Sequence, residues 1–429
     1  MQLTELNKIV RIRILQQFFG SIAGNLTKPF FGIAIAIAIG SARAGFILSI
    51  IGFFSIFWNL IGGKSADLFG RTFILLTSEI VRLCATLALI YAFYNSPQHW
   101  SLACIAFAIH TFASAFSRPA SEAFLLDITK QNERLGVFQL NYVLWNISVL
   151  AGYIVGGLTF ETSAVILFSI SAAVSVTDIF LISFFLQESK PQSRTSEDDS
   201  RLKALSSIFN RDFLHVLFPV KLLCRNKVFA NYLSLSLLQM ATAMGLQTVL
   251  AVILVEKFAE SKWTTSYLPA MSGLGIFGFL AAINAAVVIA ALPIVRSSKF
   301  LKLSERTMGI SGLAIYCIGY VGILNLNSIG LMIVSMIVLS IGESIFTPAR
   351  QFIFARLTPS EQRGEYAALN TVLFRVGSSI SPLMLSVYGF GGIPLVTIVG
   401  IGALTIAAVL LFEKLPLSSS EPQTLEANS

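Results

Sequence analysis

Several ionisable residues of this 429-residue sequence stand inside long apolar runs rather than between them. Glu343 and Asp178 are acids of this kind, and Lys28 and Arg375 are bases. An acid in apolar surroundings can bind a proton or attract a cation, and a base there can attract an anion or neutralise an acid. The chemistry that these residues offer is therefore the binding of protons and ions.

Four other charged residues are spaced so that they can pair with each other on one helix. Glu79 and Arg82 are three positions apart, and Arg118 and Glu122 are four apart, as are neighbouring residues on one face of a helix. Both pairs are therefore predicted to form ion pairs within a helix. The four cysteines and three histidines are scattered, so neither a disulfide framework nor a zinc site is predicted.

The apolar runs are too many and too long for a soluble protein. Only 12% of the residues are charged and the mean hydropathy is +0.78, whereas soluble domains contain roughly 25% charged residues. Twelve runs reach the length of about 20 residues that crosses a bilayer. Lipid cannot satisfy exposed strand edges, so all twelve are expected to be helices. The expected spans are 12–39, 43–66, 72–94, 99–125, 136–160, 163–186, 229–255, 268–294, 306–326, 328–351, 365–388 and 392–413.

The basic residues predict the orientation of these spans. With the N-terminus inside, about 23 of the 30 Lys and Arg residues lie on the cytoplasmic side and only Arg43, Lys257 and Lys262 lie outside, as the positive-inside rule requires. Twelve spans then place both termini in the cytoplasm, in a plasma (inner) membrane. This asymmetry accounts for the pI near 9.3, so a nucleic-acid partner is not expected.

Residues 116–145 and 345–374 repeat one sequence pattern at a separation of 229 positions. Eight of the 26 positions from 119 to 144 are identical to their mates, where chance gives about two. The duplication predicts two similar six-helix halves, which is typical of transporters with a site between the halves. The predicted parts are an N-terminal bundle (1–186), a cytoplasmic central loop (187–228), a C-terminal bundle (229–413) and a cytoplasmic tail (414–429).

The loop between the second and third spans has the sequence GKSADLFGRT, beginning at Gly63. It resembles motif A of the major facilitator superfamily, Gly-x-x-x-Asp-(Arg/Lys)-x-Gly-Arg-(Arg/Lys), in the same loop. Leu68 and Thr72 depart from the pattern because basic residues are usual there. The resemblance implies an all-α polytopic membrane protein with the major facilitator fold, in which twelve transmembrane helices form two pseudo-symmetric six-helix bundles.

The resemblance also implies a conformational latch at the cytoplasmic surface. Gly63 lets two helices approach each other and Gly70 permits a tight turn. Arg71 is implied to pair with Asp127, below helix four. Asp67 is implied to face the positive N-terminal end of helix eleven.

Two further motifs point to one branch of the family. Span five contains AGYIVGG, similar to the Gly-Pro-x-x-Gly-Gly antiporter motif of proton-coupled exporters, with Tyr153 in place of proline. Its glycines, Gly152, Gly156 and Gly157, would let helix five pack closely on a neighbour. Residues 342–348 (GESIFTP) resemble helix ten of multidrug exporters. The mid-membrane arginine of motif B is missing, since Phe107 lies near its expected position.

In this family helices one, four, seven and ten line the central cavity, which gives the charged residues implied roles. Glu343 is implied to hold a proton and a cationic substrate alternately; the alternative is an ion pair that holds the halves together. Lys28 would bind an anion or neutralise Glu343 or Asp178, and Asp178 is expected to be its partner or a second proton site. Arg375 suits substrate binding or a latch, and Asn141 suits helix packing or substrate contact.

The expected function is a proton-coupled secondary transporter that exports amphiphilic drugs or toxic metabolites by alternating access. The alternative is a transporter of one defined, possibly anionic metabolite, in either direction, as Lys28 and Arg375 would favour. A membrane enzyme is not expected, because it would need clustered His, Asp or Glu at a membrane face. No phosphate-binding loop is present, so no cofactor is expected and a proton gradient would supply the energy. The expected partners are a small-molecule substrate, protons and the lipid bilayer, with a monomer as the working unit.

Overall fold

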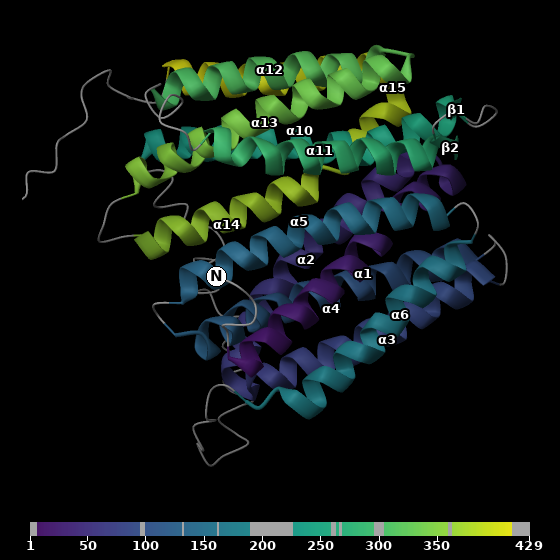
Figure 1. Cartoon of the computed structure of the whole chain (residues 1–429), viewed down its shortest axis with the longest axis vertical. Helices are drawn as coiled ribbons and strands as arrows, with labels where there is room; N and C mark the ends of the chain where they lie inside the picture. Colours follow the sequence, from purple (N-terminus) through teal and green to yellow (C-terminus); the bar gives the residue numbers. More distant parts are fainter. Residues whose placement is uncertain are drawn as a thin grey trace, which may run out of the picture. The chain divides into compact units, whose positions relative to one another are not determined.

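The computed structural model describes residues 7–94, 99–130, 133–160, 163–188, 226–258, 263–265, 268–295, 304–358 and 363–413. These ranges contain twelve α-helices and two short strands (Figure 1). The first half contributes α1 (Lys8–Ile39), α2 (Ser41–Phe69), α3 (Arg71–Tyr94), α4 (Trp100–Ile128), α5 (Arg134–Thr159) and α6 (Ala164–Phe185). The second contributes α10 (Lys227–Lys257), β1 (Trp263–Thr265), β2 (Leu268–Met271), α11 (Gly273–Val295), α12 (Glu305–Asn325), α13 (Ile329–Leu357), α14 (Arg363–Ile380) and α15 (Leu383–Glu413).

Ten of the helices in the described ranges are long and apolar enough to cross a membrane. α5 contributes a shorter apolar stretch, Val143–Gly157. The helix ends that the predicted topology places in the cytoplasm are called inner ends below, and the opposite ends are called outer ends.

Two predicted helix boundaries are wrong. The eighth span does not begin at residue 268, because Leu268–Met271 is strand β2, which pairs antiparallel with β1. Pro269 disfavours helix for the residue before it. The eleventh span is interrupted between α14 and α15, where Pro382 lies in a turn. α15 then continues through a kink at Gly392 (φ 61°), which is the expected boundary between spans eleven and twelve.

The duplication predicted from the sequence is present in the helix boundaries. α4 and α13 both contain 29 residues and begin and end 229 positions apart. Thr129 and Thr358 follow them, and each hydroxyl donates to the carbonyl four residues earlier at 2.7 Å. α5 and α14 also start at equivalent residues, Arg134 and Arg363.

Residue contacts divide the described helices into two units. The first unit contains α1 to α6 together with α10 from Met240, α11 to Ala285, and residues 374–396. Within it α1 packs on α5 and α6, α2 on α4, and α3 on α4 and α6. The second unit contains α12, packed on α13, with the remaining parts of α10, α11, α14 and α15. The four-part division of the chain stays a prediction, and the tail at 414–429 and most of the central loop lie outside the described residues.

In the first unit, α2 packs closely on the start of α15. A Cβ added to Gly45 would lie 2.5 Å from the backbone nitrogen of Ser386. The Ser386 hydroxyl donates to the carbonyl of Ala42 at 2.8 Å. Small residues let two backbones approach in this way. The outer end of α2 is therefore fixed to a segment of the second half of the sequence.

Candidate ion and proton site

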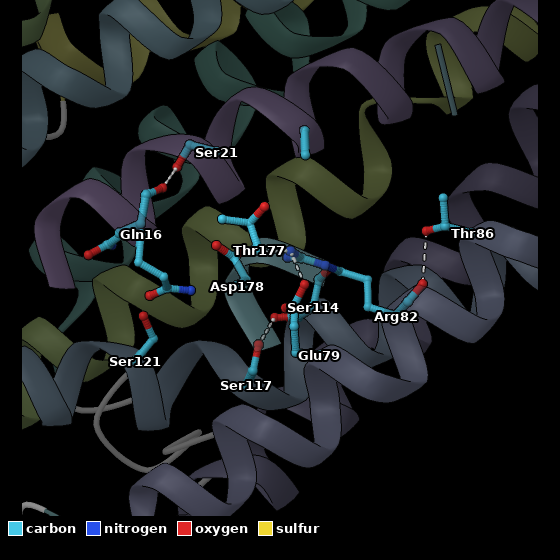
Figure 2. Close-up of polar contacts among 12 residues, drawn as sticks. Gln16, Ser21, Glu79, Arg82, Thr86, Ser114, Ser117, Ser121, Thr177 and Asp178 are labelled. Atoms are coloured by element: carbon cyan, nitrogen blue, oxygen red, sulfur yellow. Dashed lines mark hydrogen bonds and ion pairs between the residues drawn. The ribbon is translucent and has the colours of Figure 1, made fainter. Parts of the chain in front are cut away.

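A buried ion-pair cluster joins α3 and α6 in the first unit. Nη2 of Arg82 lies 2.5 Å from Oε1 of Glu79, on the same helix, and 3.4 Å from Oδ2 of Asp178 on α6. Figure 2 shows Arg82 extending from α3 toward Asp178. Asp178 is fully buried and Glu79 is 6% exposed. One guanidinium group therefore neutralises two carboxylates, and the predicted Glu79–Arg82 pair is confirmed.

The sequence of α6 explains why Asp178 points inward. Its buried residues, among them Ser171, Ser175, Asp178 and Ile182, recur at intervals of three and four, which places them on one face of the helix. The backbone of α1 approaches this face at Gly20, where a Cβ would lie 3.1 Å from Oδ2 of Asp178. The carboxylate is therefore enclosed by α1, α3 and α6.

The cluster continues to a second buried arginine, Arg13 of α1. Its guanidinium donates to Gln16 and to Ser121 of α4, and lies 5.8 Å from the ring centroid of Phe124. Gln16 is also among the groups that act on the Asp178 carboxylate, and Figure 2 shows both side chains. The expected first span, 12–39, begins just before Arg13, and the sequence did not predict that this residue is buried. The three-residue spacing of Arg13 and Gln16 was the signal that they share a helix face.

One carboxylate oxygen of the cluster lacks a partner. Oδ1 of Asp178 is buried and accepts no hydrogen bond among the described residues. A buried acceptor without a donor is destabilising, and it is also the place where a proton or a small cation can bind. The cluster can thus exchange a proton at Asp178 while Arg82 keeps its shorter contact with Glu79.

Lys28 occupies a different environment. Lys28 is an exposed residue, whereas Thr27 before it and Phe30 two positions after it are fully buried. The charges acting on it are those of Arg118 and Arg82. Asp178 takes Arg82, not Lys28, as its partner.

Arg375 and Asn141 lie outside the cluster. Arg375 is partly buried on α14, and the charges acting on it are those of Arg118 and Glu122. Arg118 and Glu122 form the predicted internal pair, with 3.1 Å between Nε and Oε1. Asn141 is partly buried on α5. Asn370 on α14, which is equivalent to Asn141 in the repeat, accepts a hydrogen bond from the Tyr232 hydroxyl of α10 at 3.5 Å.

Glu343 belongs to the second unit and is not part of the cluster. It is partly exposed on α13, where its charge acts on Tyr316 of α12. The neighbouring Gly342 brings α13 against the backbone of Tyr316. Its role in proton or cation binding stays a prediction.

The structure brings Arg71 and Asp127 together in an ion pair. Nη1 of Arg71 also donates to the carbonyl of Ala123 at 2.9 Å. Gly70, between α2 and α3, has a φ of 97°, which favours glycine. Asp67 is exposed in the last turn of α2. The inner ends of α3 and α4 are thus joined as the resemblance implied, and the role of this joint as a latch stays a prediction.

The sequence analysis did not predict two features of this region. Glu188, just after α6, accepts hydrogen bonds from the backbone N–H groups of Arg71 at 2.9 Å and Thr72 at 3.0 Å. Its carboxylate therefore caps the positive end of α3, although the sequence analysis placed it in the cytoplasmic central loop. The close approach of α2 and α4 occurs at Gly62, against the Phe116 backbone, rather than at Gly63.

The glycines of the antiporter-like motif fix α5 to two neighbours. A Cβ on Gly152 would lie 2.6 Å from Cβ of Asn25, and one on Gly156 would meet the Phe30 ring, both on α1. Gly157 faces the carbonyl of Leu274 on α11, at 2.9 Å from an added Cβ. The predicted close packing of helix five is confirmed. No group of three or more His, Cys, Asp or Glu side chains suited to a metal ion occurs among the described residues.

The comparisons with known proteins agree with this architecture. The profile of the Major Facilitator Superfamily matches residues 14–288 and 277–428. The Na(+), Li(+), K(+)/H(+) antiporter of Planococcus maritimus is 26% identical over 407 residues, covering 91% of this chain and 92% of that protein. The uncharacterized MFS-type transporter YhjO of Bacillus subtilis (strain 168) is 23% identical, covering 89% and 87%.

Solved transporters share the fold at low sequence identity. The crystal structure of peptide transporter POT in complex with sulfate has a TM-score of 0.71 at 14% identity, covering 93% of both chains. That of the nucleoside transporter NupG has a TM-score of 0.67 at 14% identity, covering 95% of this chain and 98% of its own. With the family profile matched along nearly the whole sequence, this chain belongs to the Major Facilitator Superfamily and is a membrane transporter rather than an enzyme.

Proposed function

We propose that this transporter is a proton-coupled antiporter that exports a cationic substrate, with Asp178 as its proton-binding group. The observation that carries the proposal is the state of Asp178, which is fully buried, shares Arg82 with Glu79 and keeps one oxygen without a donor. An ionisable group inside a membrane protein is costly and generally serves the transport of ions or protons. The proton gradient supplies the energy and no cofactor takes part.

Protonation of Asp178 would change how α3 is attached to α6. The charged carboxylate holds Arg82 across the helix interface at 3.4 Å, whereas Glu79 holds it within α3 at 2.5 Å. A neutral Asp178 releases Arg82 to Glu79 alone and weakens the α3–α6 contact. Because Glu188 ties the end of α6 to the start of α3, the same two helices lead to the Arg71–Asp127 pair at the inner face. Proton binding is thereby coupled to the latch.

Two classes of cation fit the proposal. The antiporter named for Na(+), Li(+), K(+) and H(+) aligns with 91% of the chain and favours monovalent metal ions. The motifs of the drug-exporter branch favour amphiphilic organic cations. Glu343, the acid of α13, would attract either class. The proposed setting is the plasma membrane, with both termini in the cytoplasm and a monomer as the working unit.

Everted membrane vesicles test the proposal directly. Respiration acidifies the lumen and quenches acridine orange; NaCl, KCl, LiCl or tetraphenylphosphonium chloride is then added. The wild type should restore fluorescence with at least one of these cations, and the responding class identifies the substrate. Asp178→Asn should abolish the response, and Glu133→Gln, an acid in the loop before α5, should leave it unchanged. A full fluorescence response in Asp178→Asn would contradict the proposal.

A second candidate function, transport of an organic anion, is favoured by the surroundings of Lys28. The ammonium group of Lys28 and the nearby Arg118 and Arg82 carry like charges, and Arg375 lies within electrostatic reach of Arg118. Such a set of cations attracts an anion. If no cation moves protons in the vesicles, proton-coupled uptake of organic anions that is lost in Lys28→Gln is the expected alternative result.

A further inference from the structure

A second titratable group, His110 on α4, is buried in the first unit and takes no part in the cluster described above. It is 2% exposed, and its Nδ1 has no hydrogen-bond partner among the described residues. Its ring is nearly parallel to that of Phe107, with centroids 6.5 Å apart. Phe107 is in turn stacked on Phe31 of α1 at 4.0 Å. An unpaired ring nitrogen inside a membrane bundle is destabilising, so a function is expected for it.

A cavity of about 460 Å³ lies on the outer side of this aromatic stack. α1, α3 and α4 line it, and the exposed His99 is among the lining residues, so the cavity reaches the outer surface. Ala34 and Ala103 mark its wall on α1 and α4. Phe31 and Phe107 lie one helical turn inward of these alanines. The stack therefore separates the outer cavity from His110.

The ion-pair cluster acts on His110 through the charge of Arg82. Arg82 from α3 and Lys28 from α1 are the charged groups that act on its ring. On α2, which also packs on α4, the charged residues are Arg43, Lys64 and Asp67, near the two ends of the helix. The cavity, the stack, His110 and the Arg82 cluster thus follow one another from the outer end inward.

We propose that His110 passes protons between the outer cavity and Asp178, with Phe31 and Phe107 as an apolar gate. This inference rests on the proposed function, in which Asp178 binds the coupling proton. A proton from cavity water binds one ring nitrogen, and the proton on the other nitrogen leaves for the Asp178 carboxylate, directly or through a water molecule. Only N–H and O–H bonds form and break, and rotation of the imidazole ring then returns the remaining N–H to the inner side. Repulsion by Arg82 and Lys28 drives the proton onward to the anionic carboxylate.

The test separates proton transfer from substrate movement in proteoliposomes. Coupled transport is measured as proton flux under a pH gradient, with ²²Na⁺ or tritiated tetraphenylphosphonium as the probe. Exchange of labelled for unlabelled probe at equal pH needs alternating access but no net proton transfer. His110→Asn should lower coupled transport at least tenfold and leave exchange within twofold of the wild type. His215→Asn, in the predicted central loop, is the matched histidine control.

A second variant covers the case in which His110→Asn loses both activities. His110→Ala leaves space beside the gate, and added imidazole should restore coupled transport if proton transfer is the role of His110. Absence of rescue in that case overturns the proposal, as does normal coupled transport in His110→Asn. If Asp178→Asn keeps normal coupling, the proposed function itself fails. If coupled transport is lost in Asp178→Asn but not in His110→Asn, the proposed function stands and only the proton relay through His110 is rejected.

Discussion

Arg82 is the residue on which the buried charges of the first unit depend. Its guanidinium has several donors in one plane and can therefore serve two carboxylates at once. Both partners are nearly inaccessible, with side chains 8% exposed for Glu79 and 1% for Asp178. Burial of two acids is tolerable only while a cation stays between them. Arg82 is thus a structural requirement as well as a participant in the proposed coupling.

Removing this cation should destabilise the protein. Arg82→Gln leaves two buried carboxylates near each other, and loss of one partner of a buried pair costs about 3–5 kcal/mol. Thermal unfolding in detergent should show a lower midpoint than in the wild type. The double variant Arg82→Gln/Glu79→Gln removes one of the stranded charges and should recover part of the loss. An unchanged midpoint in Arg82→Gln would mean that the acids are not held by this residue.

Close contact between α1 and α5 depends on the missing side chain of Gly152. An added Cβ would lie 2.6 Å from Cβ of Asn25 and 3.1 Å from its carbonyl carbon, so larger residues must push the helices apart. The hydrogen bond from Asn25 to Ser148, at 3.2 Å, would be lost with that movement. This contact sets the position of α1, which carries Gln16 and Gly20 into the ion-pair cluster.

Gly152→Val should therefore reduce both stability and transport. Overpacking of a close contact costs about 1–3 kcal/mol, which detergent thermostability and the vesicle assay can detect. Gly24→Ala on α1 is the matched control, because a Cβ there meets nothing within 4 Å. If both variants behave like the wild type, α5 does not need this contact.

Glu188 fastens α6 to α3 at their inner ends. Its two oxygens accept from two consecutive backbone N–H groups, and an N-terminal cap of this kind contributes about 0.5–2 kcal/mol. Glu188→Ala should lower the unfolding midpoint slightly and expose the adjoining segment to protease at the inner face. Glu133→Gln, which leaves this cap intact, is the control. Equal cleavage rates in the three proteins would contradict the role of the cap.

The elements themselves could be predicted from the sequence, but their neighbours could not. Span positions follow from apolar length, and the pairs Glu79–Arg82 and Arg118–Glu122 follow from helical spacing. The partner of Asp178 depends on how α3 and α6 are rotated about their axes. Membrane helices that are apolar on every side give little periodic signal for that rotation. Lys28 was therefore expected beside Asp178, and the burial of Arg13 was not foreseen.

At the scale of the whole molecule, each half has an ion pair that joins the inner ends of two helices, and the charges are opposite in the two halves. This ion pair is called the inner joint. In the first half Arg71, at the start of α3, pairs with Asp127 near the end of α4. In the second half Glu305, at the start of α12, pairs with Arg356 near the end of α13 at 3.4 Å. Arg356 follows Asp127 by the 229 positions of the repeat. The geometry was conserved between the halves while the polarity was reversed.

Reversing the charges of the second joint should therefore be tolerated only as a pair. Glu305→Arg or Arg356→Asp alone places like charges together, and each should lower transport about fivefold if the joint biases the conformational equilibrium by about 1 kcal/mol. The double variant should return to within about twofold of the wild type. Initial rates in the vesicle assay give the comparison. A double variant as poor as the singles would show that the residues act separately.

Reversed polarity also has a consequence for assembly of the chain during its synthesis. Two halves with a repeated helix of equal length, α4 and α13, offer a nascent chain a choice of wrong partners. Arg71 repels Arg356 just as it attracts Asp127, and Glu305 repels Asp127 just as it attracts Arg356. Each half thus selects its own helices, and a protein built from duplicated segments avoids exchanging them.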